Sequence, residues 1–353
     1  MKSSAAIGAG LTASACASGV TQSPADRRQR GTLNDASRKL MRDYGLKYPI
    51  FQAAPGGVDL AVAVAEAGGM GAVSLSWVSP DAATKIVARM NSETNGNYYA
   101  NYVLHFPTSS LDAALEAGCP VFQFSWGLPS EEIVSKIRKA EAHIGIQVSS
   151  KLGAQMALKL EPDFLIAQGL EAGGHVQATS SLSAALQEIL DVAGETPVIA
   201  SGGISTGEDI RNVINDGAAG AILGTRLMAT QESNGHQRYK DALVDAEDTS
   251  TSYTNCFNAN WDAAHRILKN GTFRRWDASG CPLKGNKPGE GDVVATHPQL
   301  GGVTRYSIMY PVNGHEGDVE DLAMYAGEGV SSVNDVPRAA DLLERLWNEF
   351  NGI

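Results

Sequence analysis

A histidine in a glycine-rich turn is the residue of this chain with the clearest chemical use. The turn, Gln168–His175, reads QGLEAGGH and follows the apolar run Phe164–Ile166, which is typical of a buried strand. Glycine lets a ligand approach the main chain closely, and histidine can take up and return a proton near neutral pH. We therefore interpret His175 as a candidate catalytic base, with a solvent-exposed loop histidine as the alternative.

Two later glycine-rich turns could bind a phosphate through the main chain. The first reads SGG and follows the strand-like run Pro197–Ala200, and the second reads GTR and follows Ala219–Leu223. Each precedes a helical pattern, and the N–H groups at a helix start are unpaired and carry a partial positive charge. Two such turns on neighbouring strands predict one phosphate cup, with two tight turns that bind nothing as the alternative. The predicted phosphate-cup residues are Ser201, Gly202, Gly203, Gly224 and Thr225.

Eight short apolar runs, most of them separated by helical patterns, predict the fold. The runs are Pro49–Ala54, Met70–Leu75, Tyr99–Leu104, Val121–Ser125, Ile144–Val148, Phe164–Gln168, Val198–Ser201 and Gly220–Leu223. Strands that alternate with helices pair in parallel, and eight repeats favour an α/β fold of the closed (β/α)8 TIM-barrel type over an open sheet. Such barrels bind ligands where the strands end, often with a phosphate after strands seven and eight. By this count Ser201 ends strand seven and Gly224 ends strand eight.

The chain is predicted to have four segments. Residues 1–35 are interpreted as a flexible N-terminal extension or a weak signal-like segment, and residues 36–228 as the barrel. Residues 229–314 are interpreted as a smaller lobe that acts as a lid at the barrel mouth, and residues 315–353 as a C-terminal segment that docks back on the barrel. Within this last segment, Tyr325–Gly329 either lines the site or forms a helix C-terminus capped by glycine.

Composition limits the partners and the location. The 353 residues carry a formal net charge of −11, which argues against nucleic acid and anionic membranes as partners. No apolar run reaches the roughly 20 residues that a membrane-spanning helix needs. The four cysteines have no metal-ligand spacing, so no metal site is predicted, and a reducing, cytoplasmic location is the default. The mildly apolar stretch Ala5–Val20 leaves export as the alternative.

Four motifs resemble those of the nitronate monooxygenase family, formerly called 2-nitropropane dioxygenases. They are QGLEAGGH at 168–175, ASGGI at 200–204, LGTR at 223–226 and YAG at 325–327. The resemblance runs from about Tyr48 to the C-terminus, and its first motif is specific to this flavin-dependent group. It implies an FMN-dependent barrel with an inserted lobe that oxidises alkyl nitronates, with O2, to a carbonyl compound and nitrite.

The resemblance also implies roles for individual residues. His175 would act as the base or as a hydrogen-bond donor to the nitro group, with His105 as a second candidate at the barrel mouth. Tyr325 and Gly329 would lie in the substrate site. By their positions just past a strand, Trp77 and Trp126 could form a wall of this site, with packing under the lid as the alternative. After His175 the chain reads VQA, where many family members have a glycine two residues on, so the substrate loop differs. The implied cofactor-binding residues are Ala54, Pro55, Gly56, Asn101, Gln168, Ala172 and Gly173, together with the phosphate cup.

Three functions stay open on the sequence alone. The first is FMN-dependent oxidation of nitronates, and of nitroalkanes where a base removes the α-proton. The second is an FMN-dependent reductase that uses NAD(P)H on enoyl thioesters or quinones, although the chain lacks the Gly-x-Gly-x-x-Gly fingerprint with a downstream acid. The third is a flavin-binding protein with little turnover. The expected partners are a small-molecule substrate and O2, and the oligomeric state, a homodimer included, stays open.

Overall fold

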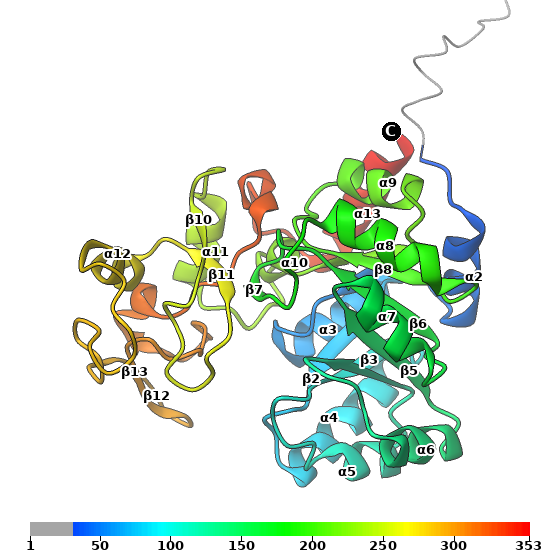
Figure 1. Cartoon of the computed structure of the whole chain (residues 1–353), viewed down its shortest axis with the longest axis horizontal. Coiled ribbons are helices and arrows are strands. Elements are labelled where there is room, and N and C mark those ends of the chain that lie inside the picture. Colours follow the sequence, from blue (N-terminus) through cyan, green and yellow to red (C-terminus); the bar gives the residue numbers. More distant parts are fainter. Residues whose placement is uncertain (1–30) are drawn as a thin grey trace, which may run out of the picture.

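The computed structural model describes residues 31–353. Most of the N-terminal segment expected over residues 1–35 therefore lies outside the described residues. Its last residues are held in place, because the amide of Gly31 donates a hydrogen bond to the carbonyl of Phe350 at 2.8 Å. The side chain of Asn34 then caps the first described helix, α2 (Asp35–Asp43). The described chain thus begins beside its own C-terminal helix (Figure 1).

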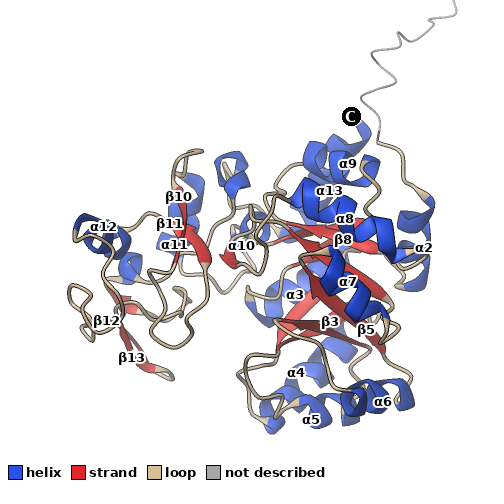
Figure 2. Ribbon diagram, in the orientation of Figure 1, coloured by secondary structure: helices blue, strands red, loops and turns tan. Residues whose placement is uncertain are grey.

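The eight expected strands form one parallel sheet that closes into a barrel (Figures 1 and 2). The barrel strands are β1 (Ile50–Gln52), β2 (Gly71–Ser74), β3 (Tyr98–Val103), β4 (Val121–Ser125), β5 (His143–Val148), β6 (Phe164–Gln168), β8 (Val198–Ser201) and β9 (Gly220–Leu223). Their order is β1-β9-β8-β6-β5-β4-β3-β2. The first and last strands of this order also meet, since the amide of Gln52 donates to the carbonyl of Met70 and the amide of Met70 to the carbonyl of Ile50, both at 2.9 Å. The predicted (β/α)8 barrel is confirmed.

Local capping explains where several barrel helices begin. The helices are α3 (Gly57–Ala67), α4 (Pro80–Glu93), α5 (Leu111–Glu116), α6 (Glu131–Lys139), α7 (Lys151–Leu158), α8 (Leu182–Ala193), α9 (Gly207–Asn215) and α10 (Thr225–Met228). The hydroxyls of Ser79, Ser130 and Ser181 accept hydrogen bonds from the amides three residues on, at the starts of α4, α6 and α8. These caps satisfy donors that the first helical turn would otherwise leave unpaired.

Apolar side chains pack on both faces of the barrel strands. Phe122, Ile146 and Leu165 belong to the outer layer between strands and helices, and Phe51 and Tyr99 to the layer inside the barrel. The alternation follows from strand geometry, because successive side chains point to opposite faces. Helix α2 also contributes to the inner layer, and this helix lies at the N-terminal ends of the strands, away from the ligand-binding end.

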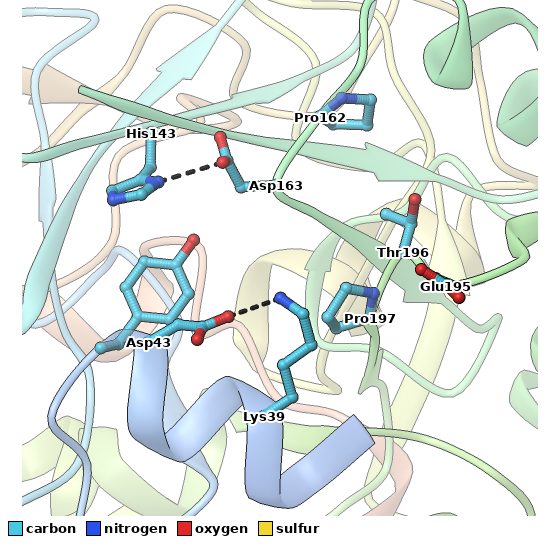
Figure 3. Close-up of a pocket in the computed structure, with 9 residues that line it drawn as sticks. Lys39, Asp43, His143, Pro162, Asp163, Glu195, Thr196 and Pro197 are labelled. Carbon is cyan, nitrogen blue, oxygen red and sulfur yellow. Dashed lines mark hydrogen bonds and ion pairs between the residues drawn. The ribbon is translucent and has the colours of Figure 1, made fainter. Parts of the chain in front are cut away.

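A histidine–aspartate pair lies in a pocket at this N-terminal end (Figure 3). Nδ1 of His143 lies 3.0 Å from Oδ1 of Asp163, whose Oδ2 accepts hydrogen bonds from the amide of Ile144 and from Arg138. The hydrogen bond to Asp163 raises the pKa of His143. Burial opposes ionisation of Asp163, but its hydrogen bonds outweigh burial and hold its pKa below the ordinary value. The pair therefore couples stability to pH.

We expect His143→Asn to destabilise the protein more at pH 6 than at pH 9. The contribution of His143 to the free energy of unfolding is complete below the pKa of about 6.5 that it has in the unfolded chain. This contribution is lost as the pH rises through the raised pKa of the folded state. The pair is partly exposed, so the loss at pH 6 should be only about 0.5–1 kcal/mol of unfolding free energy, measured by urea denaturation. Lys39→Ala, which removes the exposed ion pair with Asp43 in the same pocket, is the control and should act equally at both pH values. A pH-independent effect of His143→Asn would contradict the coupling.

A smaller lobe lies beside the C-terminal ends of the barrel strands (Figures 1 and 2). Its elements are β7 (Gly174–His175), α11 (Gln237–Val244), β10 (Thr251–Thr254), β11 (His265–Leu268), α12 (Gly271–Ala278), β12 (Val293–His297), β13 (Gly301–Thr304), β14 (Glu316–Gly317) and the 3-10 helix η1 (Val319–Asp321). They include two three-stranded sheets, β10-β11-β7 and β13-β12-β14. The lobe thus continues past residue 314, and it takes strand β7 from the loop that follows barrel strand β6.

The end of the chain packs on the barrel. After the 3-10 helix η2 (Glu328–Ser332), helix α13 (Ala339–Asn351) lies against α9 and α3. Oε2 of Glu349 accepts a hydrogen bond from the amide of Gly207 at 2.8 Å, and a Cβ on Gly207 would lie 2.2 Å from the carbonyl oxygen of Leu346. This close main-chain contact requires glycine at the start of α9.

Across residues 31–353, none of the helices combines the length and the apolar character that crossing a membrane requires. The same residues contain no group of three or more His, Cys, Asp and Glu side chains that could hold a metal ion.

Candidate active site

A cavity of about 840 Å³ opens at the C-terminal ends of the barrel strands and is lined by both the barrel and the smaller lobe. Its size suits a nucleotide-sized ligand together with a small substrate. The site residues expected from the sequence that line it are Ala54, Pro55, Gly56, Asn101, Gln168, Ala172, Gly173, His175, Ser201, Gly202, Gly203, Gly224, Thr225, Tyr325 and Gly329. His105 is the expected site residue that does not line it.

The loop after β8 offers free main-chain donors to this cavity. Gly202 and Gly203 have φ angles of 129° and 70°, a region that favours glycine. A Cβ on Gly202 would lie 3.1 Å from the amide nitrogen of Ala172, a tight contact in addition to the unfavourable φ angle. Within residues 31–353, neither glycine amide donates a hydrogen bond to another protein group. The loop therefore has the shape and the donors that a phosphate held by the main chain requires.

The C-terminal segment closes the phosphate cup from a second side. The amide of Gly327 donates a hydrogen bond to Oγ1 of Thr225 at 2.9 Å. A Cβ on Gly329 would lie 2.3 Å from the carbonyl oxygen of Gly203, and one on Gly173 would lie 2.5 Å from the amide nitrogen of Gly327. Three segments that are distant in the sequence therefore touch through their main chains.

These contacts decide between the two interpretations of Tyr325–Gly329. Tyr325, Gly327 and Gly329 line the cavity, and η2 begins immediately after Gly327. The alternative, a helix C-terminus capped by glycine, is therefore wrong, because the glycine precedes a helical turn instead of ending one.

Side-chain amides at the strand ends form a second polar group in the cavity. Nδ2 of Asn101 donates to Oε1 of Gln123 at 2.5 Å. Gln168 is tied to the turn that carries the candidate base: its Oε1 accepts from the amide of Gln177 at 2.8 Å, and its Nε2 donates to the carbonyl of His175 at 3.3 Å. Gln168 therefore positions the His175 turn in addition to lining the cavity.

His175 is half-buried, and its imidazole is uncharged and makes no hydrogen bond at Nε2. It lies in β7, directly opposite His265 of β11 in the antiparallel register. Its Nε2 is inaccessible and has no hydrogen-bond partner within the described chain. Burial, and secondarily the neighbouring His265, lower the pKa of His175 to about 3. A neutral imidazole has one N–H that can donate and one nitrogen that can accept a proton, which are the two functions predicted for this residue.

Trp261 is a site residue that the sequence did not reveal. It comes from the loop between β10 and β11, and its ring stacks on His175 with centroids 4.1 Å apart and an interplanar angle of 21°. It also meets Trp126, which follows β4, at 4.6 Å. No motif marks Trp261, and the only signal was the aromatic and basic character of residues 253–275. Trp77 and Trp126, named from the sequence as candidate walls, both line the cavity.

His105 contacts the same indole. Its ring stacks on Trp261 with centroids 5.2 Å apart and an interplanar angle of 16°. Both histidine rings are nearly parallel to the Trp261 indole, but only His175 lines the cavity. The structure thus does not bring His105 to the cavity, where it was expected as a second candidate.

The sequence model of the nitronate monooxygenase family matches residues 100–349. The protein is therefore an oxidoreductase of a flavin-dependent class of barrel enzymes. The chain belongs to the nitronate monooxygenase family, which agrees with the resemblance carried by its motifs.

Curated relatives and solved structures are consistent with this membership. A probable nitronate monooxygenase of Staphylococcus saprophyticus is 26% identical over 262 residues, which cover 60% of this chain and 73% of the relative. One of Staphylococcus aureus strain Newman is 28% identical over 255 residues, or 69% of this chain and 66% of the relative. The structure of nitroalkane oxidase from Streptomyces ansochromogenes superposes with a TM-score of 0.68 at 25% identity, covering 86% of this chain and 96% of that one. FabK from Thermotoga maritima shares the fold, with a TM-score of 0.70 at 20% identity over 88% and 95% of the two chains.

Proposed function

We propose that this protein binds FMN and oxidises alkyl nitronates with O2 to a carbonyl compound and nitrite. The observation that carries the proposal is the neutral, half-buried His175, which lines an uncharged cavity beside the predicted main-chain phosphate cup. Family membership supports the reaction class. Activity on neutral nitroalkanes is included where His175 can remove the α-proton.

The residues that line the cavity fit FMN. The phosphate would lie on the cup formed by Ser201–Gly203 and Gly224–Thr225, and the flavin ring would lie along the main chain of Ala54–Gly56. Asn101, Ala172 and Gly173 would contact the ring or the ribityl chain. When bound, the flavin supplies the redox chemistry between substrate and oxygen, and the protein supplies orientation and electrostatics. A single phosphate cup favours FMN over a dinucleotide.

His175 would handle the substrate in either of two ways. For a nitronate, which has already lost its α-proton, the neutral imidazole would donate a hydrogen bond to a nitro oxygen. For a neutral nitroalkane, a ring nitrogen would accept the α-proton. The stack with Trp261 and the hydrogen bond from Gln168 to the His175 carbonyl hold the ring in place for both. Trp261 also excludes water from one face of the imidazole.

We expect the purified protein to release FMN on acid treatment, as identified by chromatography. Mixed without oxygen, the yellow protein should bleach with ethylnitronate and not with NADH or NADPH. Bleaching by a nicotinamide alone would favour the alternative function, an FMN-dependent reductase. Recovery of FAD would contradict the cofactor, and bleaching by none of the three reagents would favour a flavin-binding protein with little turnover. A homodimer and a cytoplasmic location stay predictions.

A further inference from the structure

The cavity has no charged wall. Among the described residues that line it, none is Asp, Glu, Lys or Arg. Its polar groups are hydroxyls, side-chain amides, main-chain groups and the neutral imidazole of His175. A ligand charge that does not meet the phosphate cup, the imidazole or the cofactor therefore has no ionic partner here.

The space around His175 is aromatic. We call Trp126, Trp261 and Tyr325 the aromatic wall: their ring centroids lie 6.5, 4.1 and 5.5 Å from that of His175. Trp261 is only 7% exposed and packs in one apolar cluster with Val103, Phe106 and Ile308. Substituents of a substrate held at His175 would therefore meet apolar surface.

The cation nearest along the chain to this wall is already paired. Arg266 follows His265 in β11, and its Nη2 lies 2.8 Å from Glu328 and donates to the carbonyl of Leu170 at 2.9 Å. Arg266 itself is 7% exposed, so moving it into the cavity would break its ion pair with the half-exposed Glu328 and its hydrogen bond to the carbonyl of Leu170. Rearrangement of Arg266 is thus an unfavourable way to supply a positive charge.

We propose that the substrates of this site are nitronates whose other substituents are uncharged and apolar, and that nitronates carrying a carboxylate are rejected; this inference rests on the proposed function. The nitronate charge is delocalised and would be met by the imidazole N–H and the cofactor. A second charge, on a carboxylate in the substituent, would lose its water without gaining a partner. An alkyl or phenyl substituent of the same length would instead bury apolar area against the aromatic wall.

The test is a comparison of kcat/KM between substrates of equal length. We expect butylnitronate to exceed the nitronate of 3-nitropropionate by at least about 100-fold, which corresponds to two factors of ten in transition-state binding. An equal or higher value for the carboxylate would overturn the inference and leave the proposed function intact. No turnover of any nitronate would instead contradict the proposed function.

A variant can introduce a positive charge into the cavity. Ile308 lines the cavity and belongs to the cluster that supports Trp261. Ile308→Lys should lower the preference for butylnitronate about tenfold, whereas Ile308→Met, which adds length without charge, should leave it unchanged. If Ile308→Lys folds and keeps the full preference, the absence of charge is not what selects the substrate, and the inference is wrong. If Ile308→Lys does not fold, the wild-type comparison alone decides.

Discussion

Gly224→Leu is expected to give a folded protein that purifies without its yellow colour. Gly224 has a φ of −104°, which any residue can adopt, and a Cβ there would make only an ordinary 3.4 Å contact with the Cβ of Ala53. The fold therefore tolerates a side chain, while the rest of the leucine would extend into the cavity where the phosphate is predicted. We expect flavin content, measured by absorbance of the purified protein, to fall at least about tenfold, since a phosphate site filled by an alkyl group loses its donors as well as its space.

Gly224→Ala is the matched control, because its single methyl group occupies only the space next to Ala53. It should keep most of the flavin, and both variants should melt as cooperatively as the wild type. Gly202→Leu should lose flavin too, but it is the less clean test: Gly202 has a φ of 129°, and its Cβ would press on the main chain of Ala172. Full flavin content in folded Gly224→Leu would show that the start of α10 does not hold the phosphate.

His175→Asn is expected to affect the two forms of substrate unequally. Turnover of neutral nitroalkanes should fall by roughly 10²–10⁴-fold, because the group that accepts the α-proton is gone. Turnover of preformed nitronates should fall less, since only a hydrogen bond to a charged group, worth about 1.5–3 kcal/mol, is at risk. Flavin content should stay near that of the wild type, because His175 is not among the predicted cofactor contacts.

His105→Asn serves as the control for this prediction. His105 also stacks on Trp261 but does not line the cavity, so both activities should persist. Equal loss of both activities in His175→Asn would assign His175 to substrate binding instead of proton transfer. If neither activity falls, His175 is a loop histidine without a catalytic role, and His105 becomes the next candidate.

The barrel could be predicted because its signals are local. The runs Val121–Ser125 and Phe164–Gln168 coincide with β4 and β6, and helix α4 begins at a serine cap followed by proline, a start signal that the sequence itself contains. Apolar periodicity, capping side chains and glycine turns each act within a few residues of the chain, so they can be read from it directly. The order of the glycine-rich turns along eight repeats then predicted that they meet at one end of a closed barrel.

The site could be predicted only as far as its residues lie at strand ends. Ser201, Gly224 and His175 reach the cavity because parallel strands all end at the same face of the barrel. The lobe residues carry no such positional signal. Trp261 and His175 are 86 residues apart in the sequence, and they stack only because β11 pairs with β7. Strand β7 has two residues, which is too short for a sequence pattern to predict.

The sequence by itself therefore determined the eightfold barrel, the glycine-rich loops at its mouth and the identity of the candidate base. Tertiary structure alone decided the surroundings of that base: its stack with Trp261, its pairing opposite His265, the position of His105 outside the cavity and the absence of charged side chains from the cavity lining. The physical reason is that burial and ring contacts are properties of residues brought together from distant segments. The lowered pKa of His175 arises first from burial, and burial has no representation in a local pattern of residues.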